Sequence, residues 1–150
     1  MQNTYILIAL AIVAGIFIPL QGAVNNRMAA VLSDSPMLAS LISFAVGTLS
    51  LLAYVLIAGP PISSLAAARN APWIAWTGGL LGAFFVSMTV MLVPRLGVAL
   101  TFGVVVAGQM VFSVLMDHFG MLGLEQRPAT LPRIIGILLI LGGAFLIRKY

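Results

Sequence analysis

The residues best suited to bind a solute are side-chain amides set inside long apolar stretches. Gln21 and Asn25 are four positions apart, so a helix places both on one face. Pro19 stands just before them and removes a backbone hydrogen-bond donor. Gln109 lies close to the middle of a later apolar stretch. Because a polar group within a membrane costs free energy unless it is paired, we assign these three amides to a substrate pathway, with an interhelical clasp as the alternative.

Three further polar residues lie nearer the ends of the apolar stretches and are expected to make structural or inter-subunit contacts. Asn26 and Arg27 follow Asn25 directly, and Asp117 ends the fourth stretch. If two copies pair in opposite orientations, Asp117 of one copy lies on the same membrane side as Arg27 of the other. We therefore predict that these two charges can form an ion pair between copies.

Enzymatic and metal chemistry have little support in the composition. The chain has no cysteine and one histidine, His118, so thiolate metal sites and cysteine nucleophiles are excluded. No nucleophile, base and orienting group occur together. The three acidic residues, Asp34, Asp117 and Glu125, stand at the ends of apolar stretches or between them, whereas a proton-coupled exporter of cations usually needs a carboxylate inside the membrane. We expect a protein that is not an enzyme and has no cofactor and no metal.

The elements that must position these residues are membrane-spanning helices. Hydrophobic residues make up 62% of the 150 positions and charged residues only 7%, against about 25% in a soluble domain. A span takes about 20 residues. The sequence predicts an all-α membrane protein with one transmembrane domain over residues 1–150, and a first helix that is retained rather than cleaved as a signal. The five predicted spans cover residues 4–30, 37–58, 72–92, 98–118 and 132–147.

The basic residues are divided almost evenly between the two ends of such a bundle. The side of the N-terminus would carry Arg69, Arg127 and Arg133, and the other side would carry Arg27, Arg95, Arg148 and Lys149. The orientation of a membrane protein is set by an excess of Lys and Arg on the cytoplasmic side, so the basic residues of this chain do not strongly favour either orientation. One dominant loop giving a unique orientation is one interpretation. We prefer dual topology, in which opposite copies form an antiparallel homodimer, because transporters with inverted repeats place their site at such an interface.

Several short motifs carry a family resemblance over nearly the whole chain. They are Pro19-Leu20-Gln21, Asn25-Asn26-Arg27, Ser43-Phe44-xx-Gly47-Thr48, Gly78-Gly79-Leu80-Leu81-Gly82-Ala83-Phe84, Pro94-Arg95-Leu96-Gly97, Gly108-Gln109 and Asp117-His118-Phe119-Gly120. With them the chain resembles the YdcZ-type family of small dual-topology inner-membrane proteins in the drug/metabolite transporter superfamily. The resemblance implies five-helix bacterial proteins that act as antiparallel pairs, as sister chains of opposite orientation or as ten-helix fusions. The small multidrug exporters of this superfamily carry a glutamate in the first helix, where this chain offers Gln21, so proton–drug antiport is not among our expectations.

These observations converge on one functional hypothesis. We expect a small-solute transporter, an exporter, that works by alternating access as a dual-topology homodimer in the bacterial inner membrane, crossing it several times. Its partners would be a second copy, membrane lipid and a small molecule of unknown identity, and the scattered basic residues exclude nucleic acid. The alternative is a non-transporting scaffold or accessory subunit. A polar cavity lined by Gln21 and Gln109 favours transport, and a dry interface that clasps both favours the scaffold.

Overall fold

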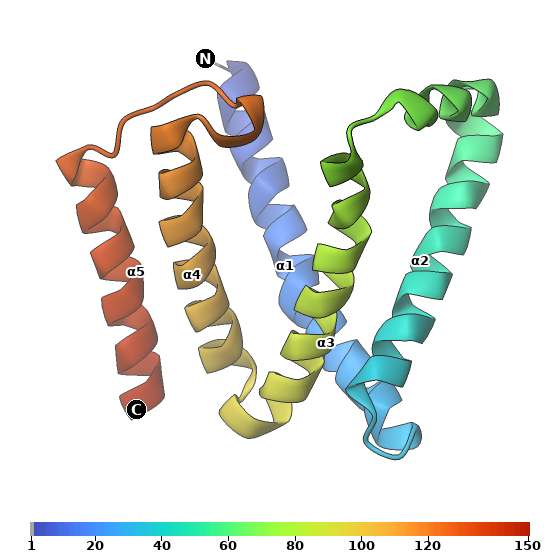
Figure 1. Cartoon of the computed structure of the whole chain (residues 1–150). Helices are drawn as coiled ribbons and strands as arrows, with labels where there is room; N and C mark the ends of the chain where they lie inside the picture. The colour runs from blue at the N-terminus through green and yellow to red at the C-terminus, as the bar shows by residue number, and fades with distance from the viewer. Residues whose placement is uncertain (1) are drawn as a thin grey trace. The chain divides into compact units, whose positions relative to one another are not determined.

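Five long apolar helices account for most of the chain in the computed structural model, which describes the backbone of residues 2–150 and the side chains of residues 4–150. They are α1 (Gln2–Val31), α2 (Pro36–Ala58), α3 (Gly78–Leu96), α4 (Val98–Phe119) and α5 (Leu131–Lys149) (Figure 1). Each has the length and composition to cross a membrane, and the part of the chain described contains no strand. The prediction of an all-α protein with five apolar helices is confirmed.

The turn between α1 and α2 follows from a few local residues. Ser33 and Asp34 take positive φ angles of 55° and 56°, and together they reverse the chain. The Ser35 hydroxyl accepts a hydrogen bond from the backbone N–H of Leu38 at 3.4 Å, which caps the first turn of α2. Pro36 opens the helix, where its missing N–H costs nothing. The sequence predicts both roles, Ser35 as the cap and Pro36 as the first residue.

The entry and exit of α3 differ from the sequence prediction. Two 3₁₀ segments, η1 (Ile62–Asn70) and η2 (Trp73–Thr77), precede the helix, so the predicted third span begins as 3₁₀ rather than as α-helix. We predict a break over residues 93–97, but α3 continues through Pro94 and ends only at Leu96. The turn itself is made by Gly97, whose φ of 78° is strained for any other residue.

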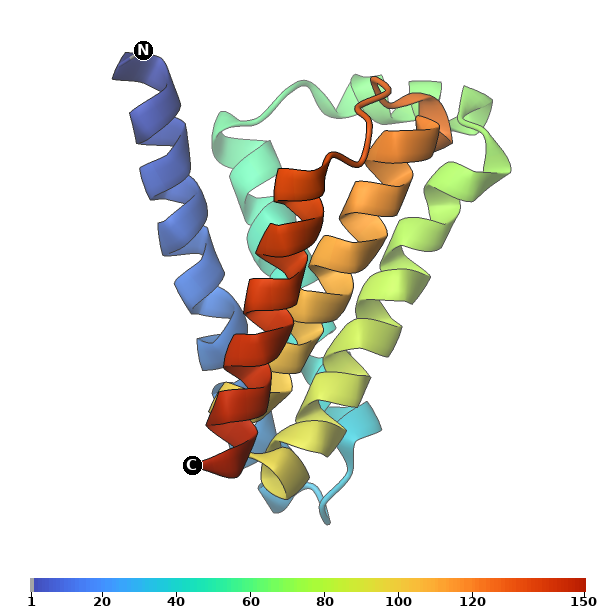
Figure 2. The same cartoon turned by 90° about the vertical axis from the view of Figure 1, so that its left-hand side faces the viewer.

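The chain divides into two compact units, Met1–Pro94 and Arg95–Tyr150, and each is described by itself. In the first unit α1 packs on α2, and α3 contributes Val86 and Val90 to a core with Ala29 and Ala39 (Figures 1 and 2). Phe44 from α2 packs against this core, and a Cβ at Gly82 of α3 would lie 3.4 Å from its ring. Small residues thus let these helices approach closely. The grouping of residues 1–150 into a single transmembrane domain stays a prediction.

In the second unit α4 and α5 run antiparallel side by side (Figures 1 and 2). A Cβ at Gly103 would lie 3.7 Å from the Cβ of Ala144, so the two helices meet through small residues. At the end of α4, Gly120 adopts the left-handed conformation with a φ of 60° and caps the helix.

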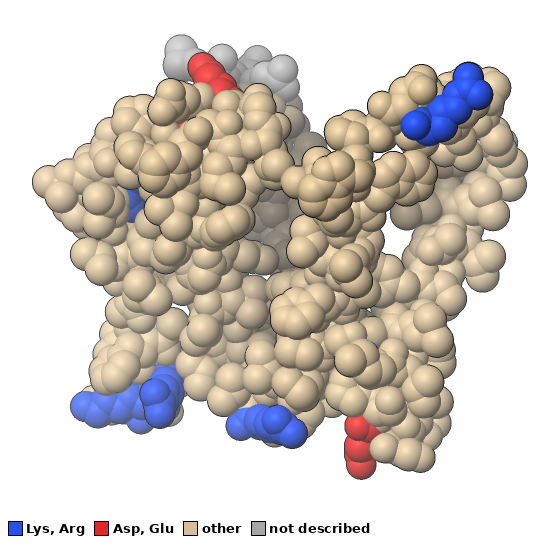
Figure 3. All heavy atoms as spheres, in the orientation of Figure 1, with Lys and Arg blue, Asp and Glu red and all other residues tan. Residues whose placement is uncertain are grey.

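On the face shown in Figure 3, Lys, Arg, Asp and Glu lie near the helix ends and the middle of each unit carries none.

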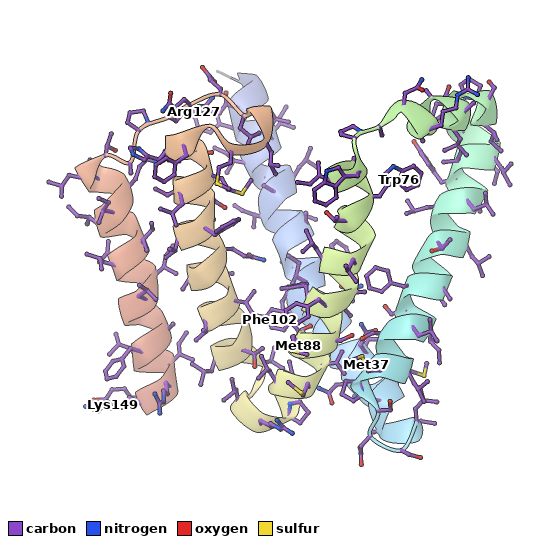
Figure 4. All side chains as sticks on the ribbon, viewed as in Figure 1. Met37, Trp76, Met88, Phe102, Arg127 and Lys149 are labelled. Atoms are coloured by element: carbon purple, nitrogen blue, oxygen red, sulfur yellow. The ribbon has the colours of Figure 1, made fainter. Side chains whose placement is uncertain are left out.

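The connection from α4 to α5 folds back onto the end of α4. The backbone N–H of Arg127 donates to the carbonyl of Asp117 at 2.8 Å, and Gln126 Nε2 donates to the carbonyl of His118 at 2.9 Å. His118 Nδ1 accepts from the backbone N–H of Ala129 at 3.2 Å. Arg127, labelled in Figure 4, also donates to Glu125 at 2.9 Å, and this hydrogen bond and the carboxylate charge raise the pKa of Arg127 above its usual value.

Candidate solute-binding groove

Two neighbouring open grooves follow the contact between α1 and α2. The groove at Gln21 has a volume of about 210 Å³ and is lined by Gln21, Ser43, Phe44, Gly47, Thr48 and Leu51. The groove at Asn25 has a volume of about 180 Å³ and is lined by Val24, Asn25, Met28, Ala39, Ile42, Ser43 and Val46. Ser43 lines both. The two amides are one turn apart on α1, so they bring hydrogen-bonding groups to successive levels of one crevice.

Asn25 is the side chain in these grooves whose hydrogen bonding is incomplete. Only 5% of the residue is exposed, and its Nδ2 atom has no hydrogen-bond partner among the residues that the structure describes. Leaving a buried polar group unpaired costs about 1–3 kcal/mol, so native proteins rarely keep one without a reason. Ala39, which is 1% exposed, lines the same groove from α2. Asn25 therefore lines the groove with an amide whose nitrogen is buried and has no partner among the described residues.

Asn26, the next residue, joins α1 to α3 through a hydrogen bond. Its Nδ2 donates to the backbone carbonyl of Val90 on α3 at 3.2 Å. In a regular helix that carbonyl would accept from the N–H of residue 94, but residue 94 is proline and has no N–H. Since Val90 is 1% exposed, water does not reach the freed carbonyl easily, and Asn26 supplies the missing donor. This clasp lets α3 continue through Pro94.

The other residues assigned from sequence are divided between the two units. Gln21 is exposed and lines its groove, and Arg27 is exposed near the end of α1. Gln109 is exposed on α4, in the second unit, and its place in a pathway with Gln21 and Asn25 stays a prediction. Asp117 forms an ion pair with Arg133 across the start of α5. Its pairing with Arg27 of a second copy stays a prediction, and its carboxylate already has a partner within the chain.

Residues of α2 supply eight of the twelve lining residues of the crevice, and the sequence does not assign them to it. Ser43 and Thr48 bring hydroxyl groups, and Phe44 brings an aromatic ring. Ser43 and Gly47 are four apart, as are Gln21 and Asn25, and this shared spacing is the signal that could have placed them together. Small residues at this spacing usually mark the packing faces of helices, so the pattern at Ser43 does not by itself predict a binding role.

A third groove, of about 220 Å³, lies on the other side of Phe44, between α2 and α3. Its lining is Met37, Ser40, Leu41, Phe44, Ala83 and Ser87, and Figure 4 shows Met37 near the start of α2. The Ser40 hydroxyl donates to the carbonyl of Pro36 at 2.8 Å, so its hydrogen bond is already made. This groove is almost wholly apolar in consequence, and it offers less for recognition than the crevice at Gln21 and Asn25.

Comparison with known protein families finds one family over nearly the whole chain. Its sequence model matches residues 6–146 and is described as "Putative inner membrane exporter, YdcZ". The matched range includes α2, α3 and α4 in full, most of α1 and α5, and every residue of the crevice. No curated protein and no solved structure matches the chain.

Proposed function

Because the chain belongs to the YdcZ family of inner-membrane exporters, we propose that it exports a small solute by alternating access as an antiparallel homodimer. The observation that carries the proposal is the buried Asn25 amide, whose nitrogen lacks a partner in the wall of an open groove. A polar group kept unpaired inside a membrane is expensive, and binding a solute is a function that repays it. The pathway would be lined by Gln21, Asn25 and Gln109.

The pairing of two copies is supported by Gln109 and by the basic residues. The Gln109 side chain is exposed near the middle of α4 and has no hydrogen-bond partner within its own unit. An amide that faced lipid there would be costly, and a second copy can cover it. The nearly even division of Lys and Arg between the two sides favours opposite orientations for the two copies. Such a pair would place its pathway at the interface, in the inner membrane of a bacterium.

The export function can be tested without knowing the solute. Cells that express the wild-type protein, the Asn25→Leu variant or an empty vector are compared by untargeted mass spectrometry of the spent medium. We expect at least one small molecule to accumulate outside the wild-type cells several-fold above both other cultures. Equal amounts of wild type and variant in the membrane fraction are the control. Identical media from all three cultures would refute export and leave a scaffold.

The orientation of the copies has its own test, because the chain contains no cysteine. Single cysteines at Ser64→Cys, in η1, and Tyr150→Cys, at the end of the chain, would lie on opposite membrane sides in a five-span protein. A membrane-impermeant maleimide added to intact cells should label a fraction of each variant if both orientations are present. Labelling confined to one of the two positions would show a single orientation and exclude the antiparallel homodimer.

A non-transporting scaffold is the second candidate, and one contact favours it. The Asn26 amide, beside Asn25, donates a hydrogen bond that holds α1 against α3. If Gln21 and Asn25 also served packing alone, the crevice would be filled by a neighbouring protein, and the medium would not change in the export experiment.

A further inference from the structure

We propose that the crevice formed by the two grooves at Gln21 and Asn25 selects an uncharged solute with an apolar body and one hydrogen-bonding edge, rather than an organic cation. This inference rests on the proposed function, since it takes the crevice as the place where the exported solute binds. It goes further by naming the class of solute.

The described residues around the crevice offer hydrogen bonds but no charge. The polar groups are the amides of Gln21 and Asn25 and the hydroxyls of Ser43 and Thr48, and the rest of the lining is apolar. A cation that leaves water for such a place loses its hydration and gains no counter-charge, which lowers its affinity. An amide, a lactam or an alcohol has no such cost.

The carboxylates of the described structure are not available to a cation in the crevice. Asp34 lies exposed in the turn between α1 and α2, outside both grooves. Asp117 pairs with Arg133, and Glu125 pairs with Arg127, within the second unit. A bound cation would therefore be left without a partner.

Asn25 gives the crevice its hydrogen-bonding preference. The amide carries a donor and an acceptor, and a turn of the amide by 180° exchanges them. When the amide turns toward the groove, its nitrogen is a donor for a carbonyl or hydroxyl oxygen, and the Ser43 hydroxyl in the same lining can donate or accept. A planar carboxamide-like edge meets both groups, and the ring of Phe44 in the neighbouring groove offers an apolar face. The groove at Asn25 has room for roughly six water molecules at ~30 Å³ each, which suits a molecule of metabolite size.

The experiment compares three probes of one shape and different charge: benzamide, benzamidinium and benzoate. The reporter is Val46→Cys, which lines the groove at Asn25 and leaves every polar lining group in place. The matched control is Ala45→Cys, the neighbouring position on α2, exposed and outside both grooves. The full-length protein is held in lipid nanodiscs, and the rate of thiol modification by N-ethylmaleimide is measured with increasing probe.

We expect benzamide to slow modification of the Val46→Cys thiol and to leave the Ala45→Cys thiol unaffected. Benzamidinium and benzoate should need at least about tenfold higher concentration for the same protection, because a charge without a counter-charge inside a membrane costs more than a tenfold factor in affinity. Protection by either charged probe at the benzamide concentration, or no protection by any probe, would overturn the inference.

Two variants sharpen the result. Gln21→Glu puts a carboxylate at an exposed lining position, where it is easily accommodated, and should shift the preference toward benzamidinium. Asn25→Asp should do the same, and Gln21→Glu keeps the test valid if Asn25→Asp does not fold. The binding assay requires no transport, so protection by benzamide without any exported solute would defeat the proposed function alone, and export together with protection by benzamidinium would defeat only the solute class.

Discussion

The clasp between Asn26 and the Val90 carbonyl gives the most direct test of how α3 tolerates its proline. Replacing Asn26 by alanine leaves the carbonyl of a residue that is 1% exposed without its donor at 3.2 Å. A buried unpaired group costs about 1–3 kcal/mol in soluble proteins, and interhelical hydrogen bonds in membranes average about 0.6 kcal/mol. We therefore expect Asn26→Ala to lower the free energy of unfolding by about 1–2 kcal/mol.

Asn26→Ala should cost much less stability in a protein that already carries Pro94→Ala. An alanine at position 94 restores the N–H that a regular helix donates to the carbonyl of residue 90, so Asn26 is no longer needed there. The cost of Asn26→Ala should fall to below about 0.5 kcal/mol, which is a coupling energy of about 1 kcal/mol in the double-mutant cycle. Reversible unfolding in mixed micelles, followed by circular dichroism, measures all four proteins.

Pro19→Ala is the matched control for this cycle. It removes the proline inside α1 but leaves the Val90 carbonyl without an intrahelical donor, so the cost of Asn26→Ala should remain at its full value. If Asn26→Ala costs the same amount in the wild-type and Pro94→Ala backgrounds, the link between the amide and the proline is wrong.

Three other changes have outcomes set by the structure. Asn25→Leu puts an apolar side chain of similar size in place of a buried amide whose nitrogen has no partner. The thermal midpoint should stay level or rise, by up to about 1 kcal/mol in stability, while export is lost. A large loss of stability would show that the amide is paired in the folded protein. Either Asp117→Arg or Arg133→Asp alone should lower the stability by less than about 1 kcal/mol, because both side chains are about one-third exposed. The double change should restore the thermal midpoint. A double variant no more stable than the single ones would discount the ion pair. Gly103→Ala should be tolerated, since its Cβ would lie 3.7 Å from that of Ala144. Gly103→Leu should instead separate α4 from α5 and lower the thermal midpoint by several degrees. Equal midpoints for the two variants would contradict the close contact.

The sequence predicts most of the secondary structure because the bilayer imposes simple rules on it. A span must be long and apolar, so residues 98–118 predict α4 (Val98–Phe119) within one residue at its end. Pro94 is where local reasoning is wrong, because the donor that lets α3 continue comes from Asn26, which is 64 positions away in the sequence. Proline alone predicts a break, and only the packing of α1 on α3 cancels it.

The candidate site is predicted only in part for a similar reason. The four-residue spacing of Gln21 and Asn25 predicts their common face on α1, and the structure places both along one crevice. The spacing does not predict which helix lies opposite, so Ser43 and Thr48 are missed. It places Asn26 off this face, among the residues expected to make structural contacts, but it does not predict that its partner is the Val90 carbonyl.

The folded-back connection between α4 and α5 has a consequence for how the protein is made. The hydrogen bonds that tie this connection down join residues at most 16 positions apart, so they can form as soon as this part of the chain leaves the ribosome. Contacts this local form quickly and need no other part of the protein. The last two helices should therefore enter the membrane as one hairpin, and a choice of orientation during synthesis would apply to both helices at once.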